Sequence, residues 1–368
     1  MPRIAEQAGP VTGGVDTHAD VHVAAVVDRV GRVLGTQAFP ATAAGYRAAV
    51  AWMSAHGELA GVGVEGTGSY GAGLARYLAD CGIEVAEVIR PNRQARRQRG
   101  KSDAADAVAA AVAALSGEAS GMPKSRDGAA ESIRALRVAR AGAVKARTRA
   151  GNQLRDLILT APEPLRQQLA GRPSGRRVDM AARFRPGDPA CPAEGTKAAM
   201  ASVARRHQQL TAEITRLDAM LDELVRHAAP EGFLAKRGVA IQVAATLLVT
   251  TGDNPGRVQK EASFAALCGA SPVDASSGKQ IRHRLNRGGD RQANSALWTI
   301  AMTRLAHDPR TKAYAARRTT EGKTNKEIIR CLKRYIAREL YKTLCRPQRP
   351  RKPPHAANKQ DLSAPVLT

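Results

Sequence analysis

Residues 11–42 read VTGGVDTHADVHVAAVVDRVGRVLGTQAFPAT, which is three short apolar runs divided by turn residues. The runs are VTGGVDTH, HVAAVVDRVG and RVLGTQAFPAT, and a tight turn from Asp28 to Gly31 joins the second run to the third. Such a short connection joins antiparallel neighbours. The stretch therefore predicts a three-stranded antiparallel meander at the start of the fold.

Alternating helix and strand patterns follow this meander. A helix is expected at about Ala43–His56, a strand at AGVGVEGTG (60–68), a helix at Gly71–Asp80 and a strand at IEVAEVIR (83–90). Three hairpin strands followed by alternating helix and strand is the order of the RNase H fold. That fold has a mixed sheet in which carboxylates gather at adjacent strand ends. We therefore expect an α/β RNase H-like domain over residues 1–124.

The middle of the chain, residues 125–230, has the pattern of a helical hairpin. One seam has apolar residues spaced four, three, four and three apart, and the other has a residue every seven. The first seam is Leu210, Ile214, Leu217, Leu221 and Leu224, and the second is Leu136, Ala143, Ala150 and Leu157. The two seams predict a coiled-coil arm of two long antiparallel helices. Residues of about 171–196, rich in Pro, Gly and Arg, predict a loop or small insertion at its tip.

The C-terminal part divides into a helical domain and a tail. Residues 231–345 predict a mainly α domain, and residues 346–368 have the composition of a disordered basic tail. Within that domain, 323–344 predicts an amphipathic helix with Tyr335 on the buried face and Lys333 on the exposed face.

The charge of the chain indicates a polyanionic partner. Lys and Arg number 57 against 33 Asp and Glu, a formal net charge of +24, which favours nucleic acid. A membrane is the rival partner, but no apolar run reaches the roughly eighteen residues of a spanning helix. No signal-peptide core is present at the N-terminus, so a cytoplasmic protein is expected. Five scattered cysteines without a C-x-x-C pair predict reduced thiols rather than disulfides or a zinc ribbon.

Four carboxylates are the candidate catalytic and metal-binding residues. Asp16 and Glu65 each end an apolar strand, and the two strands are expected side by side. Asp103 and Asp106 lie three residues apart at the start of a predicted helix, so both project from one face. Clustered carboxylates repel one another unless cations neutralise them, and oxygen-rich sites suit Mg²⁺ or Mn²⁺. Two such ions about 3.5–4 Å apart can polarise a scissile phosphate.

Each acid also has a structural interpretation. Asp103 and Asp106 favour a helix N-terminus, and Glu65 can cap a strand. The four acids in this order favour the metal site over four separate structural roles. His18 and His22 have the i, i+4 spacing of a zinc pair, but they flank a strand and are expected on the surface.

Several segments resemble a known family at these residues. GVDTHAD (14–20), VGVEGTGSY (62–70) and KSDAADA (101–107) resemble the three N-terminal signatures of the DEDD transposases of bacterial insertion sequences, the insertion sequence 110 family. FAALCGASPVDASSGKQIRHRLNRGGDRQANSALW (264–298) is similar to the family's second domain. The ordered set is more specific than any one motif, and the resemblance extends over roughly residues 14–344.

The resemblance implies a DNA transposase or site-specific recombinase that cleaves and rejoins strands by metal-assisted attack of a serine on the scissile phosphate. It implies a Holliday-junction-resolvase-like N-terminal domain, an arm that forms a homo-oligomer (dimer or tetramer), and a C-terminal transposase domain. The serine is expected to be Ser277, immediately before a glycine, with Ser276 as the alternative. It also implies a noncoding bridge RNA that pairs with donor and target DNA.

Basic residues next to these sites are the candidate nucleic-acid contacts. They are Arg93, Arg96, Arg97 and Lys101 ahead of the Asp pair, and Lys279, Arg282, Arg284, Arg287 and Arg291 around the serine. Their positions predict contacts to phosphates, and the alternative is a set of solvated surface charges. Two other functions stay open: a Holliday-junction-type nuclease that uses metal-activated water, and a non-catalytic nucleic-acid-binding protein.

Overall fold

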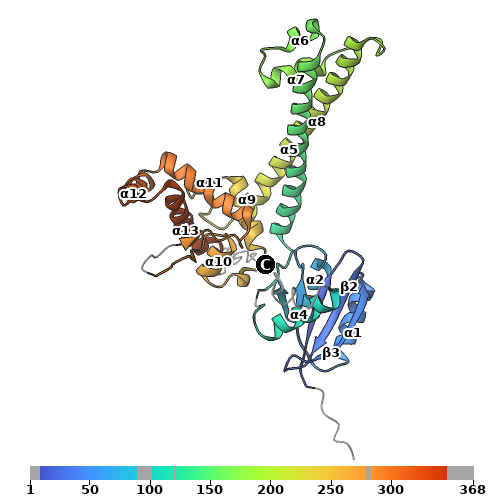
Figure 1. The fold of residues 1–368 in the computed structure, drawn as a ribbon, viewed down its shortest axis with the longest axis vertical. Coiled ribbons are helices and arrows are strands. Elements are labelled where there is room, and N and C mark those ends of the chain that lie inside the picture. The colour runs from blue at the N-terminus through green and yellow to red at the C-terminus, as the bar shows by residue number, and fades with distance from the viewer. Residues whose placement is uncertain (1–8, 89–101, 120, 279–282, 346–368) are drawn as a thin grey trace, which may run out of the picture.

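The computed structural model describes residues 9–88, 102–119, 121–278 and 283–345. Its N-terminal part is a five-stranded sheet of order β3-β2-β1-β4-β5 (Figure 1). β1 (Val11–Thr17), β2 (Val21–Val27) and β3 (Val33–Pro40) pair antiparallel. β4 (Leu59–Glu65) pairs parallel with β1, and β5 (Val85–Val88) pairs parallel with β4. The predicted meander followed by helix and strand in alternation is confirmed.

Helices cover both faces of this sheet. α1 (Ala43–Ser54) and α2 (Ala72–Asp80) alternate with the strands, and α4 (Asp103–Leu115) follows them. A Cβ built on Gly13 would meet Met53 of α1, whereas one built on Gly14 would meet Ala111 of α4. Since neighbouring residues of a strand point to opposite faces, α1 and α4 lie on opposite sides of β1.

Two glycines let α4 approach the sheet very closely. A Cβ on Gly14 would lie 2.1 Å from the backbone nitrogen of Ala111, and one on Gly63 would lie 2.3 Å from the Ala110 carbonyl oxygen. Side chains at these positions would push the helix away. Ser102 accepts a hydrogen bond from the Ala105 N–H (3.2 Å) and starts the helix. The two glycines and the Ser102 cap together fix the first turn of α4 close to the sheet.

The middle of the chain forms a long projecting arm (Figure 1). α5 (Ala129–Thr160) and α8 (Pro192–Ala228) pack along each other, with Ala143 and Ala150 buried. At the tip lie α6 (Glu163–Leu169) and α7 (Ser174–Ala182).

Of the two forms predicted for about 171–196, a loop or a small insertion, the plain loop is wrong, because α7 lies within the segment and α8 already begins at Pro192. Val178 and Ala181 of α7 join a buried cluster with Met200 and Ala204 of α8. This burial, which depends on a distant segment of the chain, stabilises a helix in a sequence whose Pro and Gly content favours a loop.

A helical body follows the arm, as predicted. It contains α9 (Ile241–Thr251), the 3₁₀ turn η1 (Pro255–Arg257), α10 (Glu261–Leu267), the short strands β6 (Val273–Asp274) and β7 (His283–Arg284), α11 (Arg291–His307), α12 (Pro309–Thr320) and α13 (Asn325–Leu344). Its core continues into the base of the arm through Ile133, Leu221 and Val225. In the described part of the chain, no helix combines the length and the apolar character that crossing a bilayer requires.

The predicted faces of α13 are wrong at two positions. Tyr335 is 52% exposed, whereas Lys333 is only 6% exposed. The Lys333 ammonium donates a hydrogen bond to Asn294 Oδ1 of α11 (2.8 Å). The buried face of α13 includes Lys333 because this helix packs against both α10 and α11.

Candidate metal centre

Asp16 and Glu65 lie at the ends of two neighbouring parallel strands. Val15 of β1 pairs with Val64 of β4, so Asp16 and Glu65 are the next residue on each strand. The Thr17 hydroxyl donates a hydrogen bond to the Glu65 backbone oxygen (2.8 Å), which ties the two strand ends together. Asp16 is 7% exposed, and Glu65 is half-buried. The β1–β4 pairing therefore puts two carboxylate-bearing residues at one edge of the sheet.

Asp103 and Asp106 approach the same edge from α4. Both lie in the first turn of the helix, Asp106 buried and Asp103 with its side chain 53% exposed. Because Gly14 and Gly63 allow the backbone of α4 to contact β1 and β4, this first turn lies close to Asp16.

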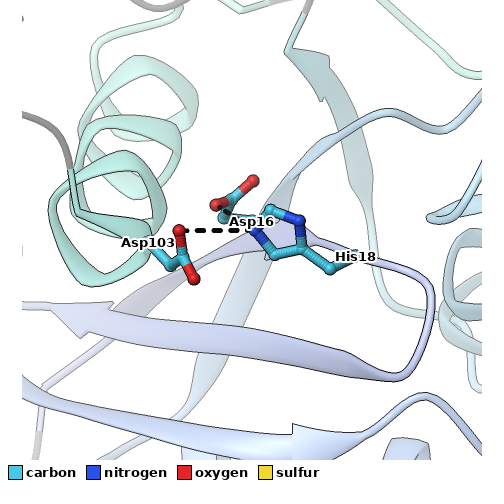
Figure 2. Close-up of side chains that lie close together, drawn as sticks. All are labelled: Asp16, His18 and Asp103. Atoms are coloured by element: carbon cyan, nitrogen blue, oxygen red, sulfur yellow. Dashed lines mark hydrogen bonds and ion pairs between the residues drawn. The ribbon is translucent and has the colours of Figure 1, made fainter.

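His18 completes a group of three possible ligands (Figure 2). Its Nε2 lies 3.2 Å from Asp16 Oδ2 and 3.4 Å from Asp103 Oδ1. One ligand atom from each of the three residues falls within 4.8 Å of the other two. Imidazole nitrogen and carboxylate oxygen together suit a divalent cation, so the donor set fits a metal. Mn²⁺ accepts a nitrogen ligand more readily than Mg²⁺, which prefers oxygen.

The expectation that His18 and His22 lie on the surface is confirmed for His18, whose side chain is 49% exposed, and is wrong for His22. His18 is in the acidic group, and His22 is 2% exposed and stacked on Tyr46 with ring centroids 5.6 Å apart. The signal for His18 was available in the sequence, because it lies two residues after Asp16 and alternate residues of a strand share a face. The burial of His22 depends on Tyr46 of α1, which no local pattern reveals.

Ser277 lies in the C-terminal body, on the connection between β6 and β7. This hairpin pairs Val273 with Arg284, and an ion pair joins His283 to Asp274 (2.9 Å). Ser277 is exposed, and among the described residues no hydrogen bond connects it to the acids of the sheet edge. Within one chain, the structure brings Asp16, His18 and Asp103 together but leaves Ser277 on a separate element.

The basic candidates divide into two groups. Six of them lie outside the described residues: Arg93, Arg96, Arg97, Lys101, Lys279 and Arg282. The other three, Arg284, Arg287 and Arg291, are exposed. Near these three, the carboxylate of Asp290 accepts hydrogen bonds from the backbone N–H groups of Gln292 and Ala293 (2.7 and 3.2 Å). The one acid in this basic segment thus caps α11.

Two family models match this chain, one over the N-terminal sheet region and one over the helical body. A family model described as a transposase, of the IS110 DEDD type, matches residues 13–161, which include the sheet, α4 and α5. A second, described as the transposase IS116/IS110/IS902 family, matches residues 233–316. The two matches together cover more than half of the 368 residues and lie in the family's order. The chain belongs to the IS110 family of transposases.

Two curated relatives are insertion-element proteins by name. The insertion element IS110 uncharacterized 43.6 kDa protein of Streptomyces coelicolor is 30% identical over 129 residues, 35% of this chain and 31% of the relative. The insertion element IS900 uncharacterized 42 kDa protein of Mycobacterium paratuberculosis is 30% identical over 138 residues, 37% of this chain and 34% of the relative. The matched stretch is therefore about a third of each relative. Residues 162–232 of this IS110-family chain, which contain α6, α7 and α8, lie outside both family-model matches.

Proposed function

We propose that this chain cleaves and rejoins DNA strands during transposition, using divalent cations held at the carboxyl edge of an RNase H-like sheet. The observation that carries the proposal is the convergence of Asp16, His18 and Asp103 within 4.8 Å. Glu65 on the neighbouring strand and Asp106 in the same first turn of α4 as Asp103 would complete a tetrad of acids with Asp16 and Asp103. The order of the sheet, three antiparallel strands and then two parallel ones, supports the RNase H-like assignment.

Ser277 is the proposed nucleophile. Its Oγ would form a bond to the phosphorus of the scissile phosphodiester, displacing the hydroxyl of one DNA strand, and rejoining would reverse the step on a new strand. A serine hydroxyl is a weak nucleophile at its free pKa and needs a base to take its proton. A carboxylate oxygen of the acidic centre that is not bound to a cation would accept this proton. Mg²⁺ or Mn²⁺ held by Asp16, Asp103, Glu65 and Asp106 would polarise the phosphate and stabilise the leaving oxygen.

The position of Ser277 supports catalysis between copies of the chain. The serine hairpin and the acidic edge belong to different parts of one chain, so a serine from a second protomer would meet the acids of the first. The projecting arm of α5 and α8 provides the helical surface for a coiled-coil dimer or tetramer (Figure 1). The net charge of +24 fits a complex with donor and target DNA and with a noncoding bridge RNA that selects the sites by base pairing.

A covalent adduct tests the role of the serine. Full-length protein, DNA carrying the insertion-element ends and Mg²⁺ should give a protein–DNA adduct that survives denaturation. The adduct should be lost with Ser277→Ala and kept with Ser276→Ala. Asp16→Asn or chelation of the metal should abolish both the adduct and strand exchange, whereas Asp80→Asn, an exposed acid at the end of α2, should change neither.

The separation of Ser277 from the acids also favours a second candidate, a resolvase-type nuclease that uses metal-activated water. Under that mechanism Ser277→Ala would still cut DNA, and no adduct would form with the wild-type chain. Strand exchange by an Asp16→Asn variant would exclude both enzymatic mechanisms and leave a nucleic-acid-binding role.

A further inference from the structure

A polar cavity of about 360 Å³ lies in the arm, between α5, α7 and α8. Its polar lining includes Arg147, Asn152 and Arg155 from α5, Ser174 and Arg177 from α7, and His207 from α8. Leu154, Ile158 and Val178 form its apolar floor and belong to the buried cluster of the arm tip. The cavity thus has a packed base and a rim of cationic groups.

The positive charge of this cavity is only partly balanced. Among the described residues Arg147 and Arg177 take part in no ion pair, and Arg155 contacts Asp156 at 3.4 Å. The other nearby carboxylate, Asp179, accepts a hydrogen bond from Gln208 (2.9 Å). Burial, together with the charge of Arg147, holds the pKa of His207 below its ordinary value. Three guanidinium groups therefore share the cavity with carboxylates that neutralise only part of their charge.

Two polar atoms of residues that line this cavity are buried: the Arg177 Nε–H, which is a donor, and His207 Nδ1, whose role as donor or acceptor depends on the ring tautomer. Arg177 Nε and His207 Nδ1 are inaccessible to solvent and have no hydrogen-bond partner in the described part of the chain. Buried polar atoms in folded proteins are nearly always paired, so these atoms indicate a missing partner. An anionic ligand in the cavity would supply acceptors for the guanidinium group of Arg177 and for those of Arg147 and Arg155 beside it.

The shape and chemistry of the cavity favour a phosphate group. Guanidinium groups bind phosphate oxygens in a planar, bidentate arrangement. Ser174 is the first residue of α7, where free N–H groups and the helix dipole favour an anion. Gly151 of α5 faces the His207 ring of α8, since a Cβ built on it would lie 3.7 Å from that ring.

We propose that this cavity binds a phosphate of a nucleic-acid backbone, which gives the arm a nucleic-acid contact of its own, away from the acidic centre. RNA and DNA share the phosphodiester, so the chemistry is the same for both. The cavity takes Arg147 and Arg155 from α5, inside the first family-model match, and Arg177 and His207 from α7 and α8, outside both matches.

The test is binding of labelled RNA and of labelled duplex DNA to the full-length chain over a series of salt concentrations. The double variant Arg147→Gln, Arg177→Gln should weaken binding about tenfold or more and lower the slope of log affinity against log salt by about one to two. The matched control, Arg149→Gln, Arg216→Gln, removes the same charge from exposed arm positions outside the cavity and should have a much smaller effect.

A second variant separates binding from folding. Ser174→Glu places a negative charge at the first turn of α7, where it stabilises the helix, and inside the cavity, where it repels phosphate. The midpoint temperature of thermal unfolding should therefore be unchanged or higher, while the affinity for nucleic acid falls. A loss of affinity for RNA alone assigns the site to RNA, and a loss of affinity for DNA alone assigns it to DNA. A loss of affinity for both assigns it to the phosphodiester backbone that they share. Affinities and salt slopes equal to those of the control pair for both nucleic acids would overturn the proposal.

Discussion

At the level of single residues, His18 changes the ligand chemistry of the acidic edge. Its ring nitrogen lies within 3.4 Å of carboxylate oxygens on both β1 and α4. A site of carboxylates alone would suit Mg²⁺, whereas an added imidazole shifts the preference toward Mn²⁺. The identity of this one side chain therefore bears on which cation the site prefers.

Pulsed electron paramagnetic resonance of bound Mn²⁺ tests this role. Wild-type protein should show the ¹⁴N coupling of a directly bound imidazole, and His18→Asn should lose it and bind Mn²⁺ on the order of tenfold more weakly. The control His227→Asn, on the exposed end of α8, should keep the coupling. Mn²⁺ bound to wild-type protein without nitrogen coupling would exclude His18 as a ligand while leaving the carboxylate site intact.

His22 makes the stability of the fold depend on pH. Both of its ring nitrogens are buried without a hydrogen-bond partner in the described structure, and burial lowers its pKa below the ordinary value of 6.5. Below about pH 6.5 His22 therefore binds a proton in the unfolded chain but stays neutral in the folded chain. The free energy of unfolding falls as the pH falls for this reason.

Urea unfolding at about pH 7.5 and about pH 5.5 measures this effect. At the lower pH, His22 should reduce the free energy of unfolding by up to about 1.4 kcal/mol for each pH unit that the pH falls. His22→Phe keeps an aromatic ring beside Tyr46 and should reduce the pH dependence, while His207 titrates in both proteins. An unchanged pH dependence in the variant would show that His22 is not responsible.

At the level of elements, the contact between α4 and the sheet controls the geometry of the acids. Gly14→Ala would place a Cβ 2.1 Å from the Ala111 backbone nitrogen, so the helix must move. We expect a loss of about 1–3 kcal/mol in the free energy of unfolding, together with weaker Mn²⁺ binding, because Asp103 and Asp106 move with the helix. The midpoint of urea unfolding and a metal titration measure the two effects.

A glycine on the arm provides the matched control. A Cβ on Gly142 of α5 would have no neighbour within 4 Å, so Gly142→Ala should stabilise the chain by about 0.5–1 kcal/mol through helix propensity. A Gly14→Ala protein as stable as wild type, with unchanged metal binding, would contradict the importance of this contact.

At the level of the whole molecule, Arg257 connects the helical body to the sheet. Its guanidinium donates hydrogen bonds to the carbonyl oxygens of Met122 (2.9 Å) and Thr250 (3.3 Å) and lies 3.4 Å from Glu87 of β5. Glu87 in turn accepts a hydrogen bond from the Thr67 hydroxyl (2.6 Å). Thr67 is two residues beyond Glu65, so this chain of polar contacts runs from the helical body to the loop beside the acidic edge.

Removing this connection should loosen the junction between the two bodies. Arg257→Gln leaves the partly buried carboxylate of Glu87 without the guanidinium that it pairs with. We expect the free energy of unfolding to fall by about 1–3 kcal/mol. Limited proteolysis should then cleave the connection at 116–128 faster than in wild type. Arg32→Gln, which removes an exposed ion pair within the sheet domain, should change stability by less than about 1 kcal/mol. Equal cleavage rates in all three proteins would rule out the junction as a stabilising contact.

The amino-acid sequence by itself determined the elements of the N-terminal sheet and the order of its acids. Periodicity and turn residues are local properties, so the meander from Val11 to Pro40, the later strands and the position of Asp16 at a strand end were all predictable. The two long arm helices were predictable for the same reason, because their seams repeat within one segment.

Only the tertiary structure decided what depends on contacts between distant segments. It placed His18 between β1 and α4, buried His22 against Tyr46, and made a helix of the Pro- and Gly-rich tip by packing α7 on α8. It also left Ser277 on a different element from the acids. The physical reason is the same in each case: burial and approach of side chains are set by residues far away in the chain, whose positions no local pattern contains.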